Sequence, residues 1–124
     1  MAKKILVIDD DIIIQKMLTS TLTKAGYSVI VAQDGDLGII AALKQLPDLM
    51  ILDIIMPGKD GIDVASFLGS NPKTKEIPII FLSVLIPEEG KKTNNRSDRY
   101  SYLSKPYNDD ELLSEVKKYF VGIN

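Results

Sequence analysis

Five short segments of the chain consist mostly of apolar and β-branched residues. Their hydrophobic positions are continuous rather than alternating, which is typical of strands buried on both faces of a parallel sheet. On this basis the sequence predicts strands at residues 5–8, 27–32, 48–52 and 77–82, and a short fifth strand around residues 102–103.

Segments with helical periodicity separate these predicted strands. Asp11 is placed to cap the first helix, whose apolar residues recur at helical spacing until Gly26 stops it. Further helices are predicted at residues 37–46, 61–68 and 109–120. Because strand and helix alternate along the chain, we expect a single domain over residues 1–124, with the doubly wound α/β fold and helices on both faces of the sheet.

The segment at residues 87–97, PEEGKKTNNRS, occupies the place of a fourth helix but has poor helix propensity. It contains a glycine and two adjacent asparagines, and it has no apolar stripe that could pack on a sheet. We expect a short, frayed or irregular helix there.

Composition narrows the chemistry that is available to this chain. Its 124 residues are 45% hydrophobic and 26% charged, with a net charge of −2 that does not suggest a nucleic-acid surface. There is no cysteine and no histidine, which excludes disulfides, thiolate metal sites and histidine catalysis. The N-terminal apolar run is too short for a signal peptide, and no stretch is long enough to span a membrane, so we expect a cytoplasmic protein.

Polar residues lie just past the ends of four of the predicted strands. They are Asp9 and Asp10 after the first, Asp53 after the third, Ser83 after the fourth and Lys105 after the fifth. Each alone could be a helix cap or a turn residue. In an open α/β sheet, however, the carboxyl ends of the strands share one edge, where ligands bind. The pattern therefore predicts one functional site rather than five unrelated caps or turn residues.

Three carboxylates brought together repel one another, and a hard divalent cation such as Mg²⁺ is their natural partner. A lysine and a hydroxyl beside that ion would form a receptor for a phosphoryl group, whose transfer depends mainly on positioning and charge neutralisation. An aspartate held there can itself be the nucleophile, giving an aspartyl phosphate.

Four motifs together resemble a response-regulator receiver domain of two-component signalling, of the chemotaxis-regulator type. They are IDDD at 8–11, LDIIMPGKDG at 52–61, PIIFLS at 78–83 and YLSKPY at 102–107. The resemblance covers essentially the whole chain in the order of the family. It implies a flavodoxin-like, five-stranded parallel sheet of order 2-1-3-4-5 with five helices around it.

The resemblance also implies roles for individual residues. Asp53 matches the phosphoacceptor, and Lys105, with a cis peptide bond to Pro106, matches the lysine that contacts the phosphoryl group. Ser83 matches the switch hydroxyl, and Tyr102 matches the aromatic residue whose rotation accompanies the switch. The Mg²⁺ ligands would be Asp10, Asp53 and the backbone carbonyl of Ile55, with Asp9 acting through a water molecule.

The function implied is that of a phosphoacceptor switch in a phosphorelay, which is not an enzyme beyond assisting its own phosphorylation and dephosphorylation. A histidine kinase or histidine phosphotransfer protein would supply the phosphoryl group to Asp53. A downstream effector protein or a fused output domain would read the changed surface of a monomer or weak dimer, with no direct contact to nucleic acid or membrane. The alternative is a phosphorylation-independent, receiver-like interaction module.

Two departures from the family pattern flank the predicted site. Val84 stands where a small residue usually follows the switch hydroxyl, which is expected to crowd access to Asp53. Ile55 stands two residues after the acceptor, where many members carry a polar side chain. An apolar residue there argues against a dehalogenase-like phosphatase, whose chemistry needs a second acid at this position.

Overall fold

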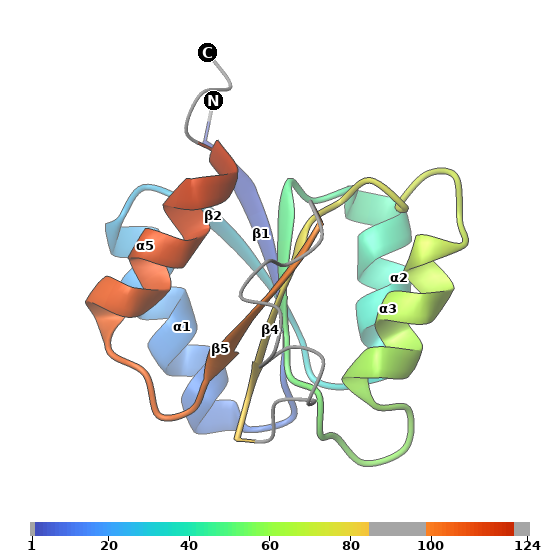
Figure 1. The fold of residues 1–124 in the computed structure, drawn as a ribbon, viewed down its shortest axis with the longest axis horizontal. Coiled ribbons are helices and arrows are strands. Elements are labelled where there is room, and N and C mark those ends of the chain that lie inside the picture. The colour runs from blue at the N-terminus through green and yellow to red at the C-terminus, as the bar shows by residue number, and fades with distance from the viewer. Residues whose placement is uncertain (1, 85–98, 121–124) are drawn as a thin grey trace.

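The chain folds into a parallel sheet with helices on both faces, in a computed structural model that describes residues 2–84 and 99–120 (Figure 1). The strands are β1 (Lys4–Ile8), β2 (Ser28–Ala32), β3 (Leu49–Leu52), β4 (Ile79–Ser83) and β5 (Tyr100–Ser104). The described helices are α1 (Ile12–Lys24), α2 (Gly35–Gln45), α3 (Gly61–Gly69) and α5 (Asp109–Phe120).

The strand order is β2-β1-β3-β4-β5, and every pairing is parallel, which confirms the predicted flavodoxin-like topology. Figure 1 shows α1 and α5 covering one face of the sheet and α2 and α3 covering the other. The irregular helix expected at residues 87–97 lies outside the described residues.

Two hydrophobic cores lie on the two faces of the sheet. The core under α1 and α5 includes fully buried residues of three strands and both helices, such as Val7, Leu18 and Leu112. The core under α2 and α3 includes Leu6, Val64 and Phe81. Every residue of β3 and β4 is buried, because these central strands are covered on both faces. The continuous apolar runs of the sequence have this origin.

The residues that were predicted to begin and end the first helix do so in the structure. The carboxylate of Asp11 accepts hydrogen bonds from the backbone N–H groups of Ile13 and Ile14 and caps α1. Gly26, directly after the last turn of α1, has a φ of +100°, a conformation that side chains disfavour. Asp34 caps α2, so this helix begins at Gly35, two residues before the predicted start.

The predicted boundaries of the fourth and fifth strands need correction. β4 begins at Ile79 rather than at residue 77, so Pro78 lies outside the strand. The fifth strand is longer than expected because each residue from Tyr100 to Ser104 pairs with β4. Its start is anchored by Arg99, whose Nε donates a 2.8 Å hydrogen bond to the carbonyl of Ile77.

Candidate active site

The parallel register of the sheet brings two aspartates together. β1 and β3 are paired so that Ile8 lies opposite Leu52, and the next residue in each strand is Asp9 and Asp53, respectively. The backbone N–H of Asp53 donates a 3.0 Å hydrogen bond to the carbonyl of Ile8, which continues the pairing one step beyond the strand. Both side chains are buried, with exposed fractions of 2% for Asp9 and 7% for Asp53.

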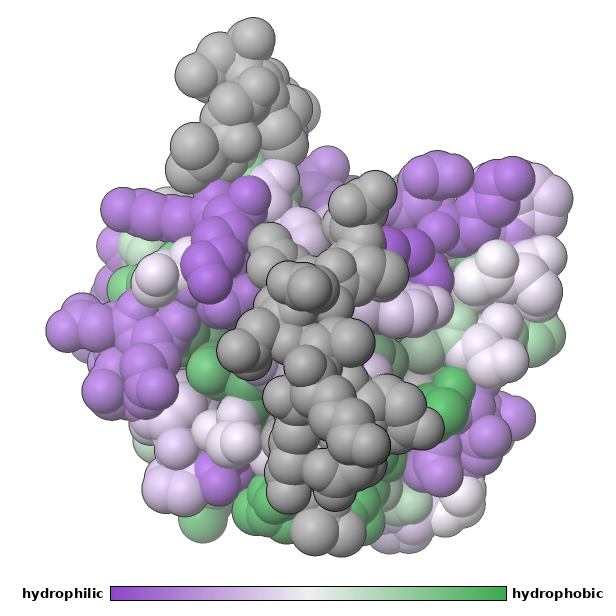
Figure 2. Space-filling model, viewed as in Figure 1, coloured by the Kyte–Doolittle hydropathy of each residue, from purple (hydrophilic) through white to green (hydrophobic). Residues whose placement is uncertain are grey.

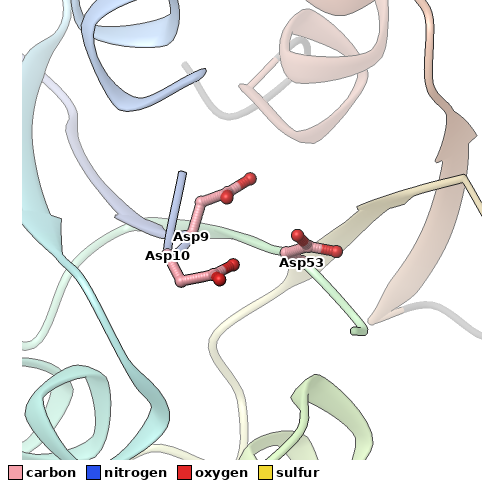
Figure 3. Close-up of side chains that lie close together, drawn as sticks. All are labelled: Asp9, Asp10 and Asp53. Carbon is pink, nitrogen blue, oxygen red and sulfur yellow. The ribbon is translucent and has the colours of Figure 1, made fainter. Parts of the chain in front are cut away.

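Asp10 completes a cluster of three carboxylates at the carboxyl ends of the strands. One carboxylate oxygen from each of Asp9, Asp10 and Asp53 lies within 4.8 Å of the others. Figure 3 shows the carboxylates of Asp9 and Asp10 extending toward the side of the site on which Asp53 lies. Asp10 is exposed, so the cluster opens to solvent on one side.

Lys105 lies between the two buried carboxylates. Its Nζ is 3.0 Å from Oδ2 of Asp9 and 3.2 Å from Oδ2 of Asp53. Its backbone N–H donates a 3.0 Å hydrogen bond to the carbonyl of Ser83, which extends the pairing of β4 and β5. The following peptide bond, to Pro106, is cis, as predicted. The sheet thus collects all five predicted strand-end residues at one edge.

Backbone and side-chain donors fix the two buried carboxylates. Asp9 Oδ1 accepts a 2.9 Å hydrogen bond from the N–H of Asp11, and Asp53 Oδ1 accepts one of 3.1 Å from the N–H of Ile55. Gln15 of α1 donates a 2.6 Å hydrogen bond from Nε2 to the carbonyl of Asp9. Gln15 was not predicted from the sequence, because a polar residue on a helix gives no signal that it reaches back to the preceding loop.

Burial and charge shift the ionisation of Asp9 and Lys105. Burial raises the pKa of Asp9 above its ordinary value, and the neighbouring charge of Asp53 adds to this, although the Asp11 N–H and Lys105 oppose it. The pKa of Lys105 is raised overall. Burial by itself would lower this pKa, but the hydrogen bond to Asp9 and the charges of Asp9 and Asp53 outweigh the effect of burial. The ammonium group is therefore held in its charged form beside an excess of negative charge.

The raised pKa of Asp9 predicts how stability depends on pH without a divalent ion. Between 3.8, the ordinary pKa, and the higher folded-state pKa, the folded protein holds a proton that the unfolded chain releases. The Asp9 contribution to the free energy of unfolding therefore falls as the pH rises through this window. We expect Asp9→Asn, which removes this titration, to be more stable than wild type at pH 7 in urea denaturation, with a gain that shrinks toward pH 3.8.

An exposed carboxylate provides the matched control for this pH dependence. The Asp36 side chain on α2 is 81% exposed, and its Oδ1 lies 3.8 Å from Nζ of Lys59, so Asp36→Asn should change stability little at either pH. An Asp9→Asn variant that is less stable than wild type at pH 7 would contradict the burial argument.

Ser83 and Tyr102 belong to the two strands beside this cluster. Ser83 is 1% exposed, and within residues 2–84 and 99–120 its Oγ has no hydrogen-bond partner. Tyr102 is half-buried and stacks on Phe81, with ring centroids 5.1 Å apart and an interplanar angle of 21°. Phe81 lies directly opposite Tyr102 in the register of β4 and β5, so the sheet itself makes this contact. Phe81 was not predicted from the sequence, because the register of paired strands is not visible there.

The donor set of the cluster fits a magnesium ion. Its ligand atoms are carboxylate oxygens, which Mg²⁺ prefers, and the single ammonium of Lys105 leaves three carboxylates short of charge balance. The open side at Asp10 leaves room for water and phosphate oxygens in the remaining positions. An acidic cluster of this kind is typical of magnesium-dependent phosphoryl chemistry.

Comparison with known proteins identifies similar sequences. A family model for the response regulator receiver domain matches residues 5–117. Protein PilH of Pseudomonas aeruginosa is 31% identical over 119 residues, covering 96% of this chain and 98% of PilH. Other curated relatives are longer, and the chain spans only 26% of the length of some of them.

Solved structures have the same fold. The chemotaxis protein CheY4 of Vibrio cholerae is 30% identical, with a TM-score of 0.86 over 96% of this chain and 99% of CheY4. The receiver domain of sensor histidine kinase PA1611 from Pseudomonas aeruginosa, solved with magnesium in its active site cleft, has a TM-score of 0.83. It covers 96% of this chain and 98% of that domain, and at 23% identity it supports the fold alone.

Proposed function

Because this chain belongs to the response regulator receiver domain family, a family of signalling modules, we propose that it accepts a phosphoryl group on Asp53 and acts as a switch. The observation that carries the proposal is the position of Asp53. Its buried carboxylate lies 3.2 Å from the ammonium of Lys105 and within the cluster of acidic oxygens that includes Asp9 and Asp10.

Asp53 is the nucleophile in the proposed reaction. A carboxylate oxygen attacks the phosphorus of a phosphohistidine, the new O–P bond forms, and the P–N bond breaks as the imidazole leaves with the electron pair. Residues 1–124 contain no histidine, so the phosphohistidine must lie outside them. Lys105 neutralises charge that develops on the phosphoryl oxygens, because its Nζ already contacts the attacking carboxylate.

Asp10, Asp53 and the carbonyl of Ile55 would hold Mg²⁺ directly, and Asp9 would act through a bound water. The ion would supply charge neutralisation to the phosphoryl oxygens. The N–H of Ile55 donates to Asp53, so the carbonyl of the same residue belongs to the loop that orients the acceptor. The charge excess of the three carboxylates over Lys105 supports this assignment.

Ser83 and Tyr102 are the proposed mobile parts of the switch. The Ser83 hydroxyl is buried and has no hydrogen-bond partner in the described parts of the chain, so a phosphoryl oxygen on Asp53 would offer it an acceptor. Inward movement of Ser83 would leave space for Tyr102, which packs on Phe81 of the same strand as Ser83. Phosphorylation would shift a balance between two existing states through this contact.

Exposed apolar residues that lie close in sequence to the site residues support a protein donor. Ile12, Ile55 and Val84, which follow site residues in the chain, are 58%, 47% and 66% exposed. Figure 2 shows hydrophobic side chains along the lower edge of the view, where Figure 1 places the carboxyl ends of the strands. Such a rim suits docking of a histidine kinase or a phosphotransfer protein.

No described helix has the length and hydrophobicity to cross a membrane.

Magnesium should stabilise the folded protein through this site. At a concentration 100-fold above the dissociation constant, a ligand that binds only the folded state adds about 2.7 kcal/mol to the free energy of unfolding. We expect such an increase for wild type in urea denaturation and its loss in Asp10→Asn. The control Asp36→Asn, outside the cluster, should keep it. Equal stabilisation of Asp10→Asn and wild type would place the ion elsewhere.

The proposal is tested directly by phosphotransfer. The protein is incubated with Mg²⁺ and a set of phosphorylated histidine kinases and phosphotransfer proteins, and intact-mass analysis detects the added phosphoryl group. Transfer from at least one donor, mapped by peptide analysis to Asp53, supports the proposed function. Failure of the whole set, together with no Mg²⁺-dependent binding of beryllofluoride, would favour the phosphorylation-independent module.

A further inference from the structure

β2 is an edge strand that lacks the usual protection of edges. It ends the strand order and pairs with β1 in an unbroken register from Ser28 to Ala32. Natural sheets guard their edges with charged residues, prolines or bulges, because an open edge pairs with other strands. The sequence of β2, SVIVA, carries no charge and no proline, and Val31 is 39% exposed.

The backbone of β2 offers hydrogen-bonding groups on its outer side. The N–H of Ser28 donates to Lys3 and the carbonyl of Ala32 accepts from Asp9, so these residues face β1. Backbone groups alternate between the two sides of a strand. The N–H and C=O groups of Val29 and Val31 therefore point outward, away from β1. They form two sets placed symmetrically about Ile30.

An apolar hollow lies beside this edge. It has a volume of about 340 Å³, and its lining includes Val31 of the strand and Leu37 and Ile40 of α2. Leu37 and Ile40 are 45% and 49% exposed, so together with Val31 they form an exposed apolar patch along this edge. Another protein segment along β2 would therefore bury apolar side chains as well as pair the backbone.

Charges at the two ends of α2 indicate which protein segment could bind along the β2 edge. Asp34 caps the start of the helix, and Lys44 lies in its last turn, on the same helical face as Leu37 and Ile40 by spacing. A two-fold axis through the edge would place α2 antiparallel to α2 of another copy. Asp34 would then approach Lys44 of the partner subunit, and the opposite pair would repeat this contact.

We propose that the β2 edge binds a second copy of this chain, with the two β2 strands antiparallel about Ile30. The two five-stranded sheets would then form one continuous sheet. Val29 would exchange hydrogen bonds with Val31 of the partner subunit, and Val31 with Val29 of the partner subunit. Ile30 would face Ile30 of the partner subunit as a non-hydrogen-bonded pair, with Cα atoms about 4.5 Å apart. The apolar residues beside the edge would meet the same residues of the second copy, and the opposite charges of the α2 ends would pair. Both features favour a second copy over an unrelated strand.

Disulfide cross-linking tests the register, because the chain contains no cysteine. In the proposed dimer, Ile30→Cys puts two thiols opposite each other, at a Cα separation of about 4.5 Å that a disulfide can bridge. Ser28→Cys is the matched control on the same exposed edge. Its two copies would be four residues out of register, roughly 13 Å apart along the strands, which is too far for a disulfide.

We expect oxidation of Ile30→Cys at high micromolar concentration to give a covalent dimer on a non-reducing gel, with at least about tenfold less from Ser28→Cys. Equal cross-linking of the two variants, or none in Ile30→Cys, would overturn the proposed pairing.

Sedimentation of the unmodified chain provides the second measurement. Val31→Lys should weaken self-association at least about tenfold by placing charge on the edge, whereas Phe67→Lys, at a 47% exposed position on α3, should not. Circular dichroism verifies that each variant is folded. A wild type that stays monomeric at several hundred micromolar would also overturn the proposal. Asp53→Asn should associate as wild type does, so this result is independent of the proposed phosphorylation.

Discussion

Asp53→Asn should abolish phosphoryl transfer to this protein. An amide oxygen is a poor nucleophile, whereas the shape of the side chain is unchanged and its oxygen can still accept the hydrogen bond from the N–H of Ile55. Lys105 keeps its 3.0 Å contact with Asp9, so the fold of the site should persist. We expect a loss of at least about 1,000-fold in the rate, which corresponds to about 4 kcal/mol in the barrier.

The matched control for this variant is Asp63→Asn. Asp63 is an exposed carboxylate in the first turn of α3 and lies outside the acidic cluster. Both variants are incubated with the same phosphorylated donor and Mg²⁺, and the rate of phosphoryl incorporation is followed by intact mass. Labelling of Asp53→Asn at a rate near that of wild type would show that another group is the acceptor.

Gly61→Ala should lower the free energy of unfolding by about 3 kcal/mol or more, since overpacking against an immobile neighbour is at the costly end of such substitutions. A Cβ atom on Gly61 would lie 2.2 Å from the carbonyl oxygen of Asp53 and 2.8 Å from Cα of Ile54. Both neighbours are backbone atoms. Moreover, the N–H of Gly61 donates a 2.8 Å hydrogen bond to the carbonyl of Ile54, so the first turn of α3 is tied to the loop it would have to leave.

The same substitution should also reduce phosphorylation, because the clash falls on the residue that carries the acceptor carboxylate. Helix propensity alone predicts the opposite sign, as alanine is favoured over glycine in helices by roughly 0.5–1 kcal/mol. Urea denaturation and the phosphotransfer rate together therefore distinguish the local from the tertiary effect.

Gly69→Ala, at the other end of α3, is the matched control. A Cβ atom there would lie 3.2 Å from Nη1 of Arg99 and 3.5 Å from the hydroxyl of Tyr100, which are the ends of side chains. We expect its free energy of unfolding to stay within about 1 kcal/mol of wild type. A Gly61→Ala variant as stable as Gly69→Ala would show that the loop after β3 adapts easily.

Local sequence patterns predict some residues of the site but not others. The aspartates and the lysine were predicted because each stands at the end of an apolar run, and parallel strands share one carboxyl edge. Gln15, Gly61 and Phe81 were missed, although Gln15 binds the carbonyl of Asp9, Gly61 lies against the backbone of Asp53 and Phe81 stacks on Tyr102. Their importance comes from the way that the chain folds back on a nearby loop, or from the register of a strand pair, and neither leaves a periodic pattern in the sequence.

By itself, the sequence determined the fold class, the strand order implied by its motifs and the edge of the sheet where chemistry is possible. The fold class and this edge follow from hydrophobic periodicity, helix caps and residues at strand ends, which are properties of short segments, whereas the strand order follows from the resemblance to receiver domains. Only the tertiary structure decided that Lys105 lies between Asp9 and Asp53, that burial raises the pKa of Asp9, and that Val31, Leu37 and Ile40 line a hollow beside the edge strand β2. Distances, desolvation and exposure arise when segments pack together, so they are not encoded at any single position.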